Sequence, residues 1–234
     1  MTAETKSVRK VVTASRAHAG TALLLLAVFF GCSASGRGPV SYSYFEPPDR
    51  SDQVYVQILR WQANERDAAL PPPAAIAAVA DVGSDPLDSS APLTAEYNSF
   101  VSSQRRMLAE RVREWVQSEA ERRYRPDENG DEWPTFHELL QRGGDDCDGL
   151  ELLSLHALRA LGFLQVYRAT IEQRGDGSQH MVTLWFEDPK DPWVIDPTGF
   201  ATKTVVRMSE LPAWEPRALF TEDQIFTVRR SASR

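Results

Sequence analysis

Three residues in the second half of this chain could together perform nucleophilic catalysis. Cys147 opens an apolar run, His180 lies at the start of the segment Gln179–Phe186, and Asp196 ends the segment Trp193–Asp196. A thiol can act as nucleophile, an imidazole as its base, and a carboxylate as the group that orients the imidazole. The same side chains can also bind zinc, but zinc ligands are usually closer in sequence than Cys147 and His180. We therefore predict an acyl-transfer centre.

The apolar run after Cys147 predicts the helix that positions it. Its leucines recur at helical spacing, Asp145 or Asp146 can cap its start, and Gly162 can end it. Cys147 then lies in the first turn, where unpaired amides and the helix dipole favour a thiolate. We expect a lowered thiol pKa and an unusually reactive cysteine. The alternative is an inert, buried small side chain.

The other periodicities predict an α+β domain in which helices precede an antiparallel meander. Helices are expected over Thr94–Tyr124 and Phe136–Arg142, and a capping box of Thr135 and Glu138 begins the second. The apolar stripe of the first helix is expected to pack in the core. Strands are expected over Val54–Trp61, Phe163–Ile171, Gln179–Phe186, Trp193–Asp196, Thr204–Met208 and Gln224–Arg229.

Residues 1–32 have the pattern of an export signal. Basic residues precede an apolar stretch, Thr21–Phe30, which is too short to span a bilayer. Gly31-Cys32 resembles the end of a bacterial lipoprotein signal, so Cys32 is a candidate lipidation site; ordinary cleavage near Ser33–Ser35 is the alternative. Cys32 and Cys147 are the two cysteines of the chain, so cleavage or lipidation leaves Cys147 without an intramolecular partner.

Residues 33–93 are expected to form a tether, because prolines, alanines and serines dominate their second half. A decoration on the surface of the domain is the alternative. The catalytic domain is then expected over residues 94–234. The chain carries a net charge of −7, and loss of the first 32 residues makes it more negative. This charge argues against a nucleic-acid partner.

In their order along the chain, these motifs resemble the transglutaminase-like superfamily with its papain-like fold. That superfamily has a cysteine on a helix ending in Arg-Ala-Leu-Gly, a histidine on a strand, and a Trp-x-x-Asp-Pro-Thr strand. Cys147, Arg159–Gly162, His180 and Trp193–Thr198 match these motifs. Bacterial transglutaminase-like cysteine proteinases are the more similar group, and the matching segments are Trp133–Thr135, Gly144–Cys147 and His180–Val182. The resemblance covers about Phe100 to Thr198, and implies a Cys147–His180–Asp196 triad on a helix packed against an antiparallel sheet.

The chain departs from this family beside the cysteine. The family usually has the sequence Asp-Cys-Glu-Asp-Tyr around the cysteine, and in some members the acidic residues there resemble a calcium site. This chain has Gly149 after Asp148 instead. Asp146 and Asp148 still offer oxygen ligands for calcium. Because one carboxylate is missing, we expect weak calcium binding at most and no required cofactor. The family motif Trp-x-Thr-Pro is also altered, to Trp-Pro-Thr at Trp133–Thr135.

The chain is therefore expected to be an exported cysteine peptidase of the periplasm or outer membrane, attached to the membrane by lipid at Cys32. Its partner would be a protein or peptide substrate. Transglutaminase-type cross-linking or deamidation is an alternative that uses the same triad. A catalytically silent domain that binds a partner in the same groove is another.

Overall fold

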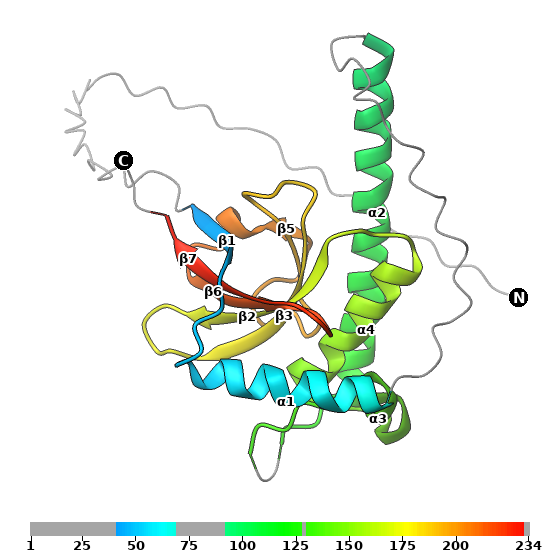
Figure 1. The fold of residues 1–234 in the computed structure, drawn as a ribbon. Coiled ribbons are helices and arrows are strands. Elements are labelled where there is room, and N and C mark those ends of the chain that lie inside the picture. Colours follow the sequence, from blue (N-terminus) through cyan, green and yellow to red (C-terminus); the bar gives the residue numbers. More distant parts are fainter. Residues whose placement is uncertain (1–40, 69–91, 128–129, 232–234) are drawn as a thin grey trace, which may run out of the picture. The chain divides into compact units, whose positions relative to one another are not determined.

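The computed structural model describes residues 41–68, 92–127 and 130–231, which all fall in one compact unit (Figure 1). The predicted α+β class is confirmed, because helices combine with a single antiparallel sheet. In chain order the elements are β1 (Tyr42–Glu46), α1 (Gln53–Ala68), α2 (Pro92–Arg123), α3 (Phe136–Arg142), α4 (Cys147–Ala160), β2 (Val166–Gln173), β3 (Gln179–Trp185), β4 (Trp193–Ile195), β5 (Val206–Arg207), the 3-10 helix η1 (Met208–Glu210), β6 (Trp214–Phe220) and β7 (Ile225–Arg230).

The sheet is more than the predicted meander. Its seven strands lie in the order β1-β7-β6-β2-β3-β4-β5, and each neighbouring pair is antiparallel. Strands β2 to β5 form a meander, but β6 returns to the free side of β2. Neither β1 nor β6 was predicted. Pro216 lies inside β6 at an irregularity in its register with β2, and a proline in a strand pattern argues against a strand.

Helix α4 carries Cys147 and packs between the other helices and the sheet. It contacts β2 and β3 on one side and α2 and α3 on the other (Figure 1). Leu152, Leu155 and Leu158 of α4 are fully buried in the core, where Met181 and Ile195 of the sheet join them. The predicted caps are present: the side chain of Asp146 accepts a bond from the Asp148 amide, and Gly162 has a φ of 83°.

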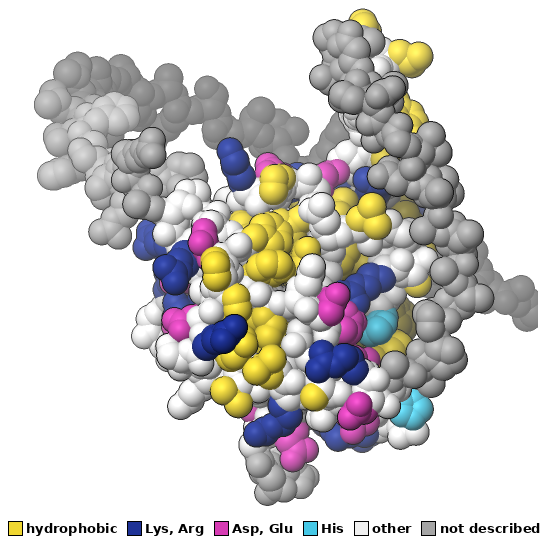
Figure 2. All heavy atoms as spheres, viewed as in Figure 1, with side chains coloured by type: hydrophobic (Ala, Val, Ile, Leu, Met, Phe, Trp, Pro, Cys, Tyr) yellow, Lys and Arg dark blue, Asp and Glu magenta, His cyan; other side chains and the backbone are white. Residues whose placement is uncertain are grey.

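The second apolar cluster lies on the other face of the sheet. Val182 and Leu184 of β3 contribute to it, together with Trp214 of β6. Near its edge the rings of Phe45, Tyr167 and Phe226 pack edge to face. Figure 2 shows hydrophobic side chains gathered over the strands on the face it presents, with charged side chains around them.

The strand predicted over Val54–Trp61 is wrong, because these residues lie within α1. Their β-branched and aromatic residues favour strands locally. The helix, however, places Ile58, Trp61 and Gln62 on one side, and all three are buried. The Trp61 indole donates to the Pro134 carbonyl, and Gln62 donates to the Thr221 carbonyl at 2.7 Å. Burial of this side outweighs local propensity.

The predicted boundary between tether and domain is therefore also wrong for residues 41–68. These residues supply β1 and α1, whose Tyr42, Tyr44, Ile58 and Trp61 lie in the two apolar clusters. Pro92 and Leu93, at the end of the expected tether, begin α2. The rest of the expected tether, residues 33–40 and 69–91, lies outside the described residues. The expected signal and Cys32 lie outside them as well. None of the helices that the structure describes is long and apolar enough to cross a membrane.

The apolar stripe of α2 is only partly in the core. Val112 and Val116 are buried as expected, together with Ala109 and Ala120. Tyr97, Phe100, Met107 and Trp115 were expected to be buried too, but they are exposed. The stripe is wider than the face that α4 and β4 cover, so sequence periodicity alone overestimates how much of it is buried.

Candidate active site

A tight turn places Cys147 at the start of α4. A Cβ atom added to Gly144 would lie 2.4 Å from the carbonyl oxygen of Arg123, so the turn approaches the end of α2 as only glycine can. The amide of Arg125 donates to the Asp145 carbonyl across the same approach. Asp146 then caps the helix, which leaves the Cys147 amide as a first-turn donor without a partner inside the helix.

His180 and Asp196 form a buried hydrogen-bonded pair beside this helix start. The Nε2 atom of His180, on β3, lies 2.9 Å from Oδ1 of Asp196, which directly follows β4. The Asp196 side chain is fully buried and that of His180 nearly so. Because a carboxylate can only accept, Nε2 carries the proton and Nδ1 is left to act as a base. This assignment gives the imidazole the tautomer that a triad needs.

The Asp196 carboxylate also organises the loop that follows it. Oδ1 accepts bonds from the amides of Thr198 and Gly199, and Oδ2 accepts from the amides of Ala201 and Thr202. Burial acts to raise the pKa of Asp196, but these donors and His180 outweigh it, and the pKa is lowered. The carboxylate is therefore ionised at neutral pH and available to stabilise an imidazolium.

Further contacts around the pair come from residues that the sequence did not identify. The Gln117 amide on α2 donates to the backbone carbonyls of Asp196 and Thr202. The rings of Phe200 and Trp214 lie 5.5 and 6.0 Å from the His180 ring. These contacts hold the imidazole in one orientation.

Cys147 and His180 line the same cavity of about 180 Å³. Its other lining residues are Asp131, Trp133, Asp146, Asp148, Thr170, Gln179 and Met181. The hydrogen bonds among the described residues do not include one between the thiol and the imidazole. Catalytic hydrogen bonds are often long before substrate binds. The structure thus brings the three predicted residues to one place, and their catalytic roles stay predictions.

The thiol of Cys147 does not have the lowered pKa that its helix position predicts. Burial, followed by the nearby carboxylate of Asp146, raises its pKa to about 12, and Asp148 acts in the same direction. The Met181 amide lowers the pKa but does not compensate. The expectation of a pre-formed thiolate is therefore wrong for the structure as it stands. The acidic neighbours oppose the helix dipole.

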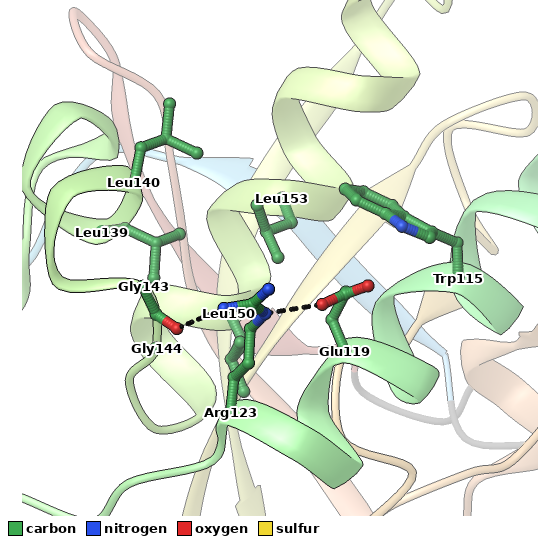
Figure 3. Close-up of a pocket in the computed structure, with 9 residues that line it drawn as sticks. All are labelled: Trp115, Glu119, Arg123, Leu139, Leu140, Gly143, Gly144, Leu150 and Leu153. Atoms are coloured by element: carbon green, nitrogen blue, oxygen red, sulfur yellow. Dashed lines mark hydrogen bonds and ion pairs between the residues drawn. The ribbon is translucent and has the colours of Figure 1, made fainter.

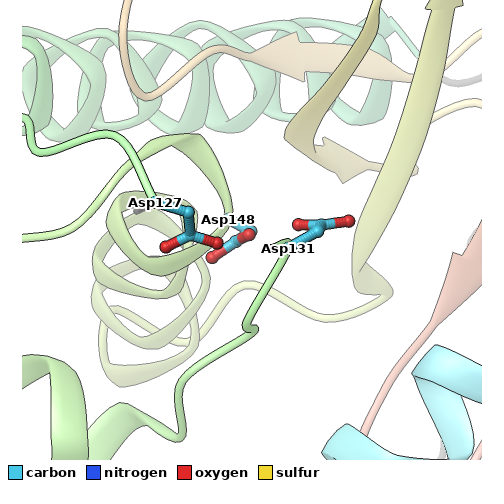
Figure 4. A group of neighbouring side chains, drawn as sticks. All are labelled: Asp127, Asp131 and Asp148. Carbon is cyan, nitrogen blue, oxygen red and sulfur yellow. The ribbon is translucent and has the colours of Figure 1, made fainter. Parts of the chain in front are cut away.

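These neighbours belong to an acidic cluster that is larger than the sequence indicated. Ligand oxygens of Asp127, Asp131 and Asp148, which Figure 4 shows, lie within 4.8 Å of one another. The same holds for those of Asp145, Asp146 and Asp148. Asp148 is 3% exposed, and its Oδ1 has no hydrogen-bond partner. Burial and the adjacent Asp146 raise the pKa of Asp148 to about 10. Hard carboxylate oxygens around a buried, unpartnered one fit a calcium ion.

The expectation that Gly149 leaves too few ligands is therefore incomplete. A Cβ atom at Gly149 would lie 2.5 Å from Cβ of Asp145, so the glycine admits the Asp145 side chain beside Asp148. Asp127 and Asp131 come from the loop after α2 and were not predicted as ligands. Their sequence, Asp-Glu-Asn-Gly-Asp, does alternate oxygen side chains at the spacing of calcium loops, which was a usable signal.

A larger groove of about 310 Å³ lies between α2, α3 and α4. Figure 3 shows Arg123 inside it, donating to Glu119 and to the Gly143 carbonyl, with leucines and Trp115 around. The groove holds no nucleophile or imidazole among its lining residues, so the smaller Cys147 cavity is the better candidate for chemistry.

No family model matches this chain, and no curated protein matches it in sequence. Among solved structures, LapG of Legionella pneumophila is similar at 19% identity, covering 57% of this chain and 76% of that chain, with a TM-score of 0.46. Its calcium-bound form gives a TM-score of 0.45 at the same identity and coverage. A protein of Cytophaga hutchinsonii, provisionally titled a cysteine protease, is similar at 10% identity over 53% of this chain and 43% of its own, with a TM-score of 0.32. The resemblance drawn from the motifs thus has counterparts among solved structures, at scores too low to give any residue of this chain its role.

Proposed function

We propose that the protein is a cysteine peptidase that uses Cys147 as nucleophile, His180 as base and Asp196 as the orienting carboxylate. The single observation that carries the proposal is the buried His180–Asp196 pair, 2.9 Å apart, in the wall of the cavity that holds Cys147. A buried imidazole and carboxylate are costly unless they pair, and here they pair beside a thiol. Nucleophile, base and orienter are what amide cleavage through a thioester requires.

The reaction proceeds in two halves. The sulfur of Cys147 attacks the peptide carbonyl carbon while Nδ1 of His180 takes the thiol proton. The tetrahedral oxyanion accepts a hydrogen bond from the Cys147 amide, which is one half of an oxyanion hole. His180 returns the proton to the leaving amine, and the C–N bond breaks to give the thioester. Water, deprotonated by His180, then attacks the thioester, and the thiol leaves with the proton.

The high pKa of the thiol decides when its proton leaves. At neutral pH the free enzyme holds a neutral thiol, so the proton moves to His180 as the carbonyl is attacked. Asp196 stabilises the resulting imidazolium. Asp127, Asp131 and Asp148 would hold a calcium ion, and its charge, when bound, would offset the carboxylates that raise the pKa of Cys147. Calcium would thereby favour the thiolate without taking part in the bonds that form and break.

We further propose that the protein acts outside the cytoplasm, on a protein or peptide, and that lipid at Cys32 attaches it to a membrane. The support is the basic and apolar pattern of residues 1–32 and the single remaining cysteine. Any tether after Cys32 would end before β1, because β1 belongs to the folded unit. Mass measurement of the native protein tests this, since a diacylated Cys32 at the N-terminus differs in mass from a chain cleaved near Ser33–Ser35.

Candidate surface proteins should be incubated with the full chain, with and without a free amine, and the products identified by mass spectrometry. Hydrolysed peptide bonds that are absent with Cys147→Ala support the peptidase. Amine incorporation or conversion of glutamine to glutamate, in place of chain cleavage, would assign transamidation or deamidation to the same triad. Capture of a substrate without any covalent change, equally by wild type and Cys147→Ala, would show a silent binding domain.

A further inference from the structure

We infer that Arg168, Glu151 and Thr183 form a buried positioning unit that fixes Cys147 relative to His180. The inference rests on the proposed function, because it concerns the geometry between that function's nucleophile and base. None of the three residues was identified from the sequence. Each has a side chain that the fold covers completely.

The unit ties the first turns of α4 to two strands of the sheet. Nε of Arg168, on β2, donates to Oε2 of Glu151 at 2.6 Å, and Nη2 donates to the Asp148 carbonyl at 2.6 Å. The other carboxylate oxygen of Glu151 accepts a bond from the Thr183 hydroxyl on β3. Arg168 and Thr183 lie directly opposite each other in the β2–β3 ladder. A single carboxylate on α4 therefore connects both strands to the helix.

This connection joins the helix that carries Cys147 to the strand that carries His180. Asp148 follows Cys147 directly, and Glu151 lies about one helical turn after it. Thr183 shares β3 with His180, three positions further along the strand. The bonds of Glu151 and of the Asp148 carbonyl thus fix the height and rotation of the helix start relative to the strand that carries the imidazole. A displacement of about 1 Å between two reacting groups can lower the reaction rate about a hundredfold.

Aromatic rings keep Arg168 in one place. Its guanidinium lies 4.4 Å from the centre of the Trp61 ring and 5.6 Å from that of Trp133. Trp133 also lines the Cys147 cavity, and Trp61 comes from α1. Nη1 of Arg168 has no hydrogen-bond partner among the described residues. The unit therefore also gives α1, far from Cys147 in sequence, a route to affect the site.

Stability alone does not account for the unit. Removing two charges from water is expensive, and apolar side chains of similar volume in place of a buried ion pair are often neutral or stabilising. Directional bonds, by contrast, fix a geometry that apolar contacts would leave free to shift. The unit should therefore be dispensable for folding and required for the spacing between Cys147 and His180.

The test replaces the ion pair by apolar residues, as Arg168→Met with Glu151→Leu, in the full chain. The probe is the alkylation rate of Cys147 by iodoacetamide in one neutral buffer containing calcium, measured with and without His180→Ala. We expect a melting temperature at or above that of wild type. We also expect alkylation to fall at least about tenfold, with His180→Ala causing no further loss, because the base no longer reaches the thiol.

A matched control lies at the other end of the same helix. Arg159 pairs with Glu222 at 2.6 Å, so Arg159→Met with Glu222→Leu removes an ion pair of the same bond length, partly exposed, near the C-terminal end of α4. This control should leave both alkylation and its dependence on His180 unchanged. Thr183→Val should weaken that dependence while Thr183→Ser, which keeps the hydroxyl, restores it; these single changes serve if the double variant does not fold.

The inference is overturned if the folded variants of the positioning unit keep the wild-type alkylation rate and its dependence on His180. The triad would then remain intact. A different result separates the two proposals. If His180→Ala has no effect on alkylation even in wild type, the triad fails, and the positioning unit fails with it. Equal losses in the Arg159→Met, Glu222→Leu control would show a general effect of α4 and would also overturn the inference.

Discussion

Replacement of Asp196 by Asn should destabilise the fold, although the two side chains have the same size. All partners of the carboxylate are donors: His180, Thr198 and Gly199 bind Oδ1, and Ala201 and Thr202 bind Oδ2. An amide has one oxygen and one NH₂ group, so one side must then place donors against donors. Triad logic alone predicts a folded, inactive variant, but these contacts predict a loss of stability as well.

The size of the stability loss depends on which backbone amides are left without an acceptor in Asp196→Asn. The least harmful orientation puts the NH₂ group at Oδ2, facing the amides of Ala201 and Thr202, which lie 2.7 and 3.0 Å away. A buried donor that loses its partner costs about 1–3 kcal/mol, and these two are only partly buried, so the lower end applies. We expect Asp196→Asn to lower the free energy of unfolding by at least about 2 kcal/mol.

The assay is urea unfolding followed by tryptophan fluorescence, because Trp214 lies near this loop. Asp191→Asn is the matched control: its carboxylate binds the amide and hydroxyl of Ser209, and a hydroxyl can accept from an amide. Asp191→Asn should change stability by no more than about 0.5 kcal/mol. An Asp196→Asn variant as stable as this control would refute the reasoning.

The direction of the pH dependence provides a second check on the same variant. The pKa of Asp196 is lowered in the folded state, so its carboxylate stabilises the fold at pH values above the unfolded carboxyl pKa of about 3.9. That contribution is lost as the pH falls through the folded pKa. Asp196→Asn should lack this part of the acid destabilisation, and an unchanged acid limb would contradict the assignment.

Three further outcomes are expected. His180→Ala should reduce turnover at least about a hundredfold while the protein stays folded, because Asp196 keeps its backbone donors; near-wild-type turnover would exclude His180 as the base. In a chelator, Cys147 should react with iodoacetamide at neutral pH no faster than an ordinary thiol, since its pKa is about 12. Calcium should raise both this alkylation rate and the melting temperature of wild type, but neither of them in Asp148→Asn. No response to calcium in wild type would exclude the acidic cluster as a calcium site. Trp61→Ala should cost about 3–5 kcal/mol because the ring is buried in the core, and a small change in urea unfolding would restore the view of residues 41–68 as a tether.

The features that could be predicted from the sequence depend on residues close together in the chain. The capping box at Thr135 and Glu138, the Asp146 cap and the Gly162 terminus all involve neighbours within a few positions, and the structure has each of them. The strand that carries His180 is a short apolar run that follows the turn segment Arg174–Ser178, and this pattern was enough to recognise it. Local geometry determines such elements, and the motif order along the chain was enough to bring Cys147, His180 and Asp196 together as a hypothesis.

The errors lie where distant parts of the chain decide the outcome. Residues Val54–Trp61 form a helix because Ile58 and Trp61 then pack into the core that α4 and the sheet form. Tyr97 and Phe100 are exposed because none of the elements that the structure describes covers that side of α2. Pro216 is tolerated in β6 at a register irregularity that only pairing with β2 creates. Hydrophobic periodicity records which side chains could be buried, whereas tertiary packing decides which are.

The pKa of Cys147 was also predicted in the wrong direction because distant parts of the chain determine it. A cysteine at a helix start predicts a lowered pKa, because the dipole is a local property of the helix. Burial of the thiol and the approach of Asp146 and Asp148 reverse this direction, and Asp127 and Asp131 join them from another loop. Charge–charge interactions act through space, and so does the bond from Arg168 to Glu151. The residue types of the site were determined by the sequence, but their protonation states and spacing were decided by the tertiary structure.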